Sequence, residues 1–204
     1  MNATLNSNIT FIGGGNMAQA LIGGLLARGL PTTRIMVSDP VEAIRQLLHE
    51  KEIQAVDDNV KAIKNADVVV LAVKPQVLGT VLKPLYGLFE GKLIVSIIAG
   101  AEIETIAALT GTDRVVRVMP NTPALVQTGA HGLYANENVT TKDRDLASQI
   151  LAATGLTIWV NSEAQIDAVT AVSGSGPAYF FYLMESMIRA GKNMGLDLSL
   201  IHIS

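Results

Sequence analysis

The sequence predicts an α/β protein: a Rossmann-type, doubly wound and mostly parallel sheet, followed by the start of an all-helical C-terminal domain. Strongly apolar runs alternate with segments of helical periodicity from residue 8 to residue 162, and no strand pattern recurs beyond that point. The first apolar run also passes without a linker into three glycines and then into a helix. These observations place a dinucleotide-binding domain at residues 1–162 and the beginning of a helical domain at residues 163–204.

Composition narrows the range of functions. Of the 204 residues, 49% are hydrophobic and 16% are charged, which indicates an ordered protein with a large core. The formal net charge of −3, without a run of lysines or arginines, predicts neither nucleic-acid nor membrane binding. The chain has no cysteine and its three histidines are scattered. We therefore expect no metal site, and a cytoplasmic protein without a signal peptide or a membrane span.

The glycine-rich turn carries the strongest local signal. Gly13 would turn the chain out of the first strand, and Gly15 would let a pyrophosphate approach the backbone. Ala18 would allow the helix to pack closely on the strand, while free N–H groups at the helix start, around Asn16 and Met17, would hold the phosphates. A flexible turn without a ligand is the alternative. The strand before and the helix after favour the nucleotide site.

The end of the second strand predicts how the adenine half of a dinucleotide is held. This strand, at residues 35–37, leads to Ser38, Asp39 and Pro40. An acidic residue at this point accepts hydrogen bonds from the ribose hydroxyls of NAD in Rossmann domains. Asp39 could equally cap a helix that Pro40 opens, and the two interpretations are compatible. Ser38 would instead suit a phosphate.

The middle of the chain adds a lysine at a strand end. A short strand at residues 53–56 precedes a small helix, for which Asn59 is the expected cap. The run at residues 67–73 is the clearest buried strand, apolar on both faces, and it ends at Lys74 and Pro75. A lysine there points into the crevice where open α/β sheets bind ligands, or it simply leaves the sheet for solvent.

Two further strand ends carry small or polar residues. The next buried run ends in Ala99 and Gly100, which would let a nicotinamide or ribose approach closely. A later strand leads into Met-Pro-Asn-Thr-Pro, where two prolines should hold Asn121 and Thr122 in an extended, rigid loop at the sheet edge; a plain turn is the alternative. The remaining elements of this domain are expected at residues 103–109 (helix), 114–118 (strand), 129–134 (strand), 140–150 (helix) and 156–160 (strand).

A long helix is predicted near the C-terminus. It follows the segment Ser-Gly-Ser-Gly-Pro, with Pro177 in its first turn and Gly195 beyond its end. Its charged residues share one narrow stripe, and the remaining surface is apolar. Because a helix that is apolar most of the way round must be buried, its partner is missing from this chain or comes from another subunit.

Four sequence blocks together resemble the pyrroline-5-carboxylate reductases, the family that completes proline biosynthesis. They are residues 11–18 (FIGGGNMA), 72–75 (AVKP), 119–123 (MPNTP) and 171–179 (AVSGSGPAY), of which the last is the most specific. The resemblance covers residues 8–198. It implies a Rossmann domain with a helical dimerisation domain, and hydride transfer from NADPH, or from NADH, to the cyclic imine 1-pyrroline-5-carboxylate, giving L-proline.

The resemblance also implies site residues. The cofactor contacts map to Gly13, Gly15, Asn16, Met17, Ala18, Ser38, Asp39, Asn59, Ala72, Val73, Lys74, Pro75, Ile97, Ile98 and Ala99. The substrate and nicotinamide pocket maps to Asn121, Thr122, Ser173 and Ser175. No residue is assigned as the catalytic acid. In relatives the position of Asp39 is often a serine beside the 2′-phosphate of NADP, so the choice between NADPH and NADH stays open.

The C-terminal end departs from the family pattern. Relatives continue through further helices, including a Gly-Gly-x-Thr segment that supplies substrate contacts, whereas residues 198–204 resemble foreign sequence at a fragment edge. We therefore expect the 204-residue chain to bind cofactor and to turn over substrate poorly. The alternatives are another NADP-dependent reductase on the same scaffold, against which the Ser-Gly-Ser-Gly-Pro block argues, and a non-catalytic NAD(P)-binding module.

Overall fold

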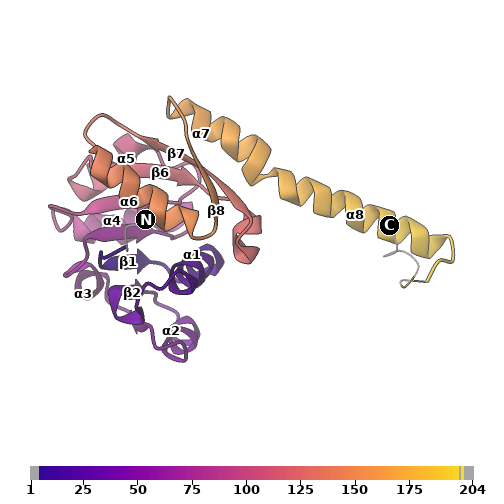
Figure 1. Ribbon diagram of the computed structural model, residues 1–204, viewed down its shortest axis with the longest axis horizontal. Coiled ribbons are helices and arrows are strands. Elements are labelled where there is room, and N and C mark those ends of the chain that lie inside the picture. Colours follow the sequence, from indigo (N-terminus) through magenta and orange to yellow (C-terminus); the bar gives the residue numbers. More distant parts are fainter. Residues whose placement is uncertain (1–4, 198, 200–204) are drawn as a thin grey trace.

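The computed structural model describes residues 5–197 and 199, and these form a layered α/β fold with one long C-terminal helix (Figure 1). The expected foreign segment at residues 198–204 therefore lies outside the described residues, apart from residue 199. The sheet has the strand order β3-β2-β1-β4-β5-β6-β7-β8, and all neighbours are parallel except β6 and β7. Its strands are β1 (Ile9–Ile12), β2 (Ile35–Ser38), β3 (Gln54–Val56), β4 (Val68–Leu71), β5 (Leu93–Ser96), β6 (Val115–Met119), β7 (Gly129–Ala135) and β8 (Gly155–Trp159).

Helices cover both faces of the sheet. They are α1 (Asn16–Ala27), α2 (Glu42–His49), α3 (Asn59–Ile63), α4 (Leu78–Leu82), α5 (Ile103–Thr110), α6 (Thr141–Ala152), α7 (Ala164–Val169) and α8 (Gly176–Asn193). One apolar cluster joins the sheet to α1, α2 and α6, and a second joins the opposite face to α3, α4 and α5. The expected doubly wound, mostly parallel fold is confirmed, because β4 and its neighbours are covered on both faces.

Local chemistry explains where most elements begin and end. Thr140 caps α6 as expected, since its hydroxyl accepts a hydrogen bond from the Asp143 N–H. Gly29 has a φ of +90° and stops α1 one residue beyond its C-cap. Three expectations were wrong in detail. Asp58 rather than Asn59 caps α3, and α2 begins at Glu42 rather than directly after Asp39.

The third correction concerns the loop after β6. Only Asn121 is extended, and from Thr122 to Val126 the chain forms a 3₁₀ helix instead of a rigid extended loop. Pro123 lies within the first turn, where its fixed φ and missing N–H are compatible with helical geometry. The two prolines therefore end one element and start another.

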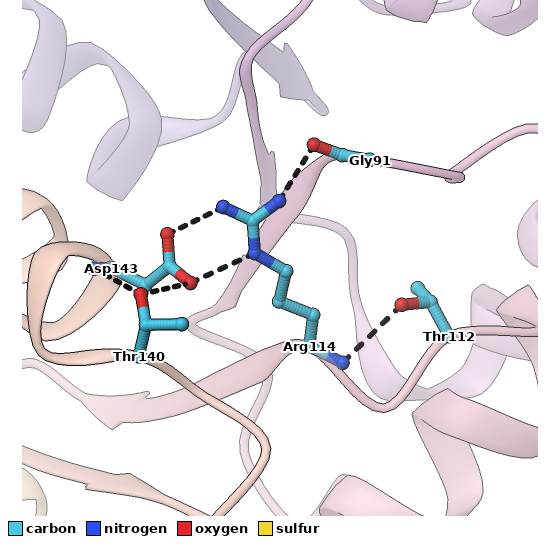
Figure 2. Close-up of polar contacts among 5 residues, drawn as sticks. All are labelled: Gly91, Thr112, Arg114, Thr140 and Asp143. Atoms are coloured by element: carbon cyan, nitrogen blue, oxygen red, sulfur yellow. Dashed lines mark hydrogen bonds and ion pairs between the residues drawn. The ribbon is translucent and has the colours of Figure 1, made fainter.

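An arginine–carboxylate pair fastens α6 to the amino end of β6 (Figure 2). The Arg114 guanidinium donates to both carboxylate oxygens of Asp143, from Nε at 2.8 Å and from Nη2, and its Nη1 donates to the Gly91 carbonyl. Asp143 is 2% exposed, and the Arg114 hydrogen bonds together with that from the Thr140 hydroxyl lower the pKa of its carboxyl group. This pair lies at the sheet edge opposite the glycine turn.

Helix α8 projects away from the sheet (Figure 1). Its apolar side chains are exposed, including Phe180 at 69%, Leu183 at 56% and Met187 at 64%. In the described residues nothing covers this helix, as its composition led us to expect. None of the helices described here is long and apolar enough to cross a membrane.

Candidate active site

A cleft of about 950 Å³ opens at the carboxyl edge of the sheet. It lies beside β1 and β4, where the strand order reverses, which is the position at which doubly wound sheets bind ligands. The turns that follow β1, β2, β3 and β4 all contribute to its wall. Among the expected cofactor residues, those lining the cleft are Gly13, Gly15, Ser38, Asp39, Asn59, Ala72, Val73 and Lys74.

The glycine turn fits a pyrophosphate. Gly13 has a φ of +100°, and a Cβ placed on it would come within 2.6 Å of the Ala72 carbonyl oxygen, so the turn out of β1 needs glycine. Gly15 precedes α1, and a Cβ placed there would meet no described atom within 4 Å. The space beside Gly15 is therefore open toward the cleft, as close approach of a phosphate requires.

The start of α1 offers unpaired backbone donors. Its N-cap residue, Gly15, has no side chain to cap the helix, and the first turn contains no acidic residue. The first N–H groups of a helix have no intrahelical partner, and the helix dipole adds partial positive charge at this end. Ala18 is 1% exposed and packs into the core beneath the turn. These residues fit the two phosphates of a dinucleotide.

Asp39 connects the glycine turn to the turn after β2. One carboxylate oxygen accepts a hydrogen bond from the Gly14 N–H at 2.8 Å, and the other accepts from the Val41 N–H at 2.8 Å. The side chain is 6% exposed although it borders the cleft. Asp39 thus organises the backbone around the cleft, and each oxygen keeps a second lone pair for a further donor such as a ribose hydroxyl.

The turn after β3 carries a second acidic cap. Asp58 accepts hydrogen bonds from the N–H groups of Val60 and Lys61, and the bond from the Lys61 N–H is the main reason that the pKa of this carboxyl group is lowered. Asn59, expected as the cap, is instead the first residue of α3 and borders the cleft. Its role as a cofactor contact stays a prediction.

Asn121 and Ser173 form a polar pair from distant parts of the chain. The Asn121 Nδ2 donates to the Ser173 hydroxyl at 3.1 Å, and its Oδ1 accepts from the Ala130 N–H at 2.9 Å. Ser173 belongs to a π-helical turn, Thr170–Gly174, between α7 and α8. The expected pocket residues Thr122 and Ser175 lie within two positions of this pair in sequence, but no hydrogen bond in the described residues joins their side chains to it.

Seven expected cofactor residues lie outside the cleft wall. They are Asn16, Met17, Ala18, Pro75, Ile97, Ile98 and Ala99. The first three begin α1, where backbone N–H groups rather than side chains would face a phosphate. After β5, Ile98 is buried in the core while Ala99 is exposed, so a cofactor would meet the backbone and the Ala99 methyl group. Their contacts remain predictions.

Sequence reasoning missed Arg117 and the helix α7 that pairs with it. Arg117 is 2% exposed and forms ion pairs with Glu163 and Asp167. Its position within the apolar strand Val-Val-Arg-Val-Met is the signal that predicts burial. A buried arginine in turn predicts an acidic partner, because its charge must be paired.

The fold and the cleft define the chain as a Rossmann-type dinucleotide-binding protein. Residues 8–100 match the family model described as NADP oxidoreductase, coenzyme F420-dependent. Residues 163–200 match the model described as pyrroline-5-carboxylate reductase dimerisation.

Close relatives identify the family. The chain is 52% identical over 192 residues to pyrroline-5-carboxylate reductase from Pseudomonas aeruginosa, covering 93% of this chain and 70% of the relative. It is 48% identical over 191 residues to the Haemophilus influenzae enzyme, again covering 70% of the relative. The chain belongs to the pyrroline-5-carboxylate reductase family, and it spans about 70% of the length of these relatives.

Solved structures agree with this assignment. A pyrroline-5-carboxylate reductase from Coxiella burnetii superposes with a TM-score of 0.88 at 42% identity, covering 97% of this chain and 74% of that one. The Plasmodium falciparum enzyme, whose structure holds NADP, superposes with a TM-score of 0.86 at 30% identity, covering 98% and 74%.

Proposed function

We propose that the chain is an oxidoreductase that transfers a hydride from NADPH to the cyclic imine 1-pyrroline-5-carboxylate, giving L-proline. Its membership of a family whose named relatives carry out this reaction supports the proposal. The observation that carries it in this chain is the open space beside Gly15, at the uncapped start of α1. That geometry fits a dinucleotide pyrophosphate, and NADP is the ligand bound in a solved relative.

The chain's own residues would bind and orient the reactants. Bound NADPH would supply a hydride to the imine carbon and become NADP⁺, and water would supply the proton that the imine nitrogen gains. The glycine turn and the start of α1 would anchor the phosphates, and Asp39 would hold the turns that surround the adenine half. We propose that Asn121 and Ser173 border the nicotinamide end, where their mutual hydrogen bond fixes the direction of both polar groups.

We also propose that the chain functions as a homo-oligomer in the cytoplasm, with residues 1–162 as the cofactor domain and residues 163–204 beginning the dimerisation domain. The match of residues 163–200 to a dimerisation model supports this division, as does the exposed apolar surface of α8. A second copy is a suitable partner, because an apolar helix of this kind is stable in water only when it is covered.

Oxidation of NADPH by 1-pyrroline-5-carboxylate tests the function. The 204-residue chain should bind NADPH, and a fusion carrying the C-terminal region of the Pseudomonas aeruginosa relative should oxidise it when substrate is added. Both proteins should be assayed with NADPH and with NADH, and with a substrate-free control. If NADPH binds but the fusion never oxidises it, the reductase proposal fails and a non-catalytic nucleotide-binding module is favoured.

A further inference from the structure

Arg117 lies at the point where β6, α5 and α7 meet. Its Nη1 donates to Glu163 Oε1 at 3.1 Å, and its Nη2 donates to Asp167 Oδ1 at 2.7 Å. Arg117 is the largest fully buried side chain in the described residues. Burying a guanidinium costs free energy unless the charge is paired. Arg117 is therefore stable in the core only while the two carboxylates contact it, and these contacts hold α7 against the sheet.

Glu163 extends this link to the start of α5. The same oxygen that pairs with Arg117 accepts a hydrogen bond from the Ile103 N–H at 2.8 Å. The N-cap residue of α5, Glu102, makes no side-chain cap of its own, so a carboxylate from 60 residues further along the chain takes that place. The helix that follows the Ile97–Ala99 turn therefore depends on Glu163 for the hydrogen bond of its first backbone N–H group.

Close packing fixes the register of the segment after Glu163. Ile166 is 1% exposed, and the Val169 methyl groups lie 3.0 Å from where a Cβ of Gly132 would be. Further along, Met119 Cε lies 2.6 Å from where a Cβ of Gly174 would be. Glycine at both positions lets the segment approach β6 and β7 closely. This approach brings the π-helical turn to Asn121.

We propose that Arg117 is a positioning residue for the nicotinamide end of the cleft. In this fold the dinucleotide crosses the switch point, so its adenine half lies toward β2 and its nicotinamide half lies toward β5 and β6. Arg117 connects the start of α5, which follows β5, to the segment that carries Ser173, which meets Asn121 after β6. In the part of the chain that the structure describes, no hydrogen bond or ion pair of its side chain reaches the adenine side. This inference rests on the proposed function, because it assumes that a nicotinamide dinucleotide binds.

Two ligands distinguish binding at the adenine end of the cleft from binding at the nicotinamide end. NADPH occupies both ends, whereas adenosine 2′,5′-bisphosphate occupies only the adenine end. For Arg117→Met we expect the Kd for NADPH to rise at least about fivefold, with the Kd for the bisphosphate unchanged within about twofold. Arg117→Lys, which keeps one ion pair, should fall between wild type and Arg117→Met. Isothermal titration calorimetry measures all of these values without turnover.

Arg114→Met is the matched control. It removes a second arginine–carboxylate pair, which lies just before β6 at the opposite sheet edge, so both Kd values should stay at the wild-type level. If Arg117→Met does not fold, Glu163→Gln replaces it, with the same direction of change and a faster amide hydrogen exchange at Ile103. An equal rise in the Kd for NADPH and the Kd for the bisphosphate in either variant overturns the inference, and so does an unchanged Kd for NADPH. Absence of NADPH binding in the wild-type chain would instead overturn the proposed function.

Discussion

The carboxylate of Asp39 accepts a hydrogen bond from the backbone N–H of Gly14 at 2.8 Å, which ties the turn after β2 to the turn after β1. The guanidinium of Arg45 reinforces this contact by donating to the Asp39 carbonyl at 2.8 Å. An acidic residue at this position usually indicates a preference for NAD over NADP. Because both Asp39 oxygens accept hydrogen bonds from backbone N–H groups, the residue has a structural role in the cleft that does not depend on which cofactor binds.

Asp39→Asn should lower the affinity for both NADPH and NADH, and for NADH by the larger factor, so the ratio shifts toward NADPH. The amide oxygen can accept from one of the two N–H groups, and the lost bond loosens the glycine turn, at a cost of about 1–2 kcal/mol of stability. Loss of the negative charge also removes repulsion of the 2′-phosphate, so the preference for NADPH over NADH should rise about threefold to tenfold. Binding titrations of wild type and variant with each cofactor measure the ratio of the two Kd values. An unchanged ratio would show that the carboxylate does not act on the 2′-phosphate.

Gly15→Val should abolish NADPH binding without unfolding the protein. The φ of −67° at Gly15 is accessible to any residue, and an added Cβ meets no described atom, so the melting temperature should stay near that of wild type. The side chain would instead fill the space that the pyrophosphate needs, with an expected loss of affinity of about 100-fold or more. Gly23→Val is the control, since Gly23 also has open space beside it but lies further along α1. Wild-type affinity in Gly15→Val would refute the proposed phosphate position.

Much of the Rossmann domain was predictable because its signals are local. β4 reads as a continuous apolar run since both of its faces are covered, and Gly13 marks a turn that only glycine can make at a φ of +100°. The caps were less predictable: Asp58 and Asn59 are adjacent, and both residue types cap helices. Which of the two residues caps the first N–H groups of α3 depends on where β3 ends.

The contacts of the helical segment could not be read from the sequence. The pair of Asn121 and Ser173 joins residues 52 positions apart, and it forms only because α7 packs on β6 and β7. Helix α7 itself is six residues long, too short for a helical period to stand out. Its position depends on the buried Arg117, whose partners follow from the fold and not from any local pattern.

The stability of the protein should fall between pH 6.5 and about 4 because of His131. This side chain is 1% exposed, its Nε2 pairs with the Thr154 hydroxyl at 3.0 Å, and burial lowers its pKa from 6.5 to about 4. Between these values the unfolded chain binds a proton that the folded chain does not, so the free energy of unfolding decreases as the pH falls, by about 3 kcal/mol in all. Urea denaturation across this range measures the slope. His131→Gln should flatten it, and the exposed His49→Gln should not.

Asp143→Asn should destabilise the fold at neutral pH by about 2 kcal/mol, a value reduced because its partner Arg114 is partly exposed. The lowered pKa of Asp143 means that its ion pair contributes fully above pH 4 and is lost as the pH falls through the folded-state value. The variant should therefore differ from wild type at pH 7 and converge with it in stronger acid. Asp145→Asn, on the exposed side of the same helix, should match wild type at both pH values. A difference between Asp143→Asn and wild type that does not vary with pH would contradict this account.

Leu183→Glu or Met187→Glu should convert a self-associating chain into a monomer. Both side chains lie on the apolar side of α8, are more than half exposed, and have no covering element in the described residues. Burying two such faces against each other contributes about 1.5–3 kcal/mol for each large side chain, and a buried glutamate reverses that gain. Arg189→Glu, in the polar stripe of the same helix, is the control and should leave the oligomer intact. Sedimentation equilibrium distinguishes the states, and an oligomer that survives both glutamate variants would place the interface elsewhere.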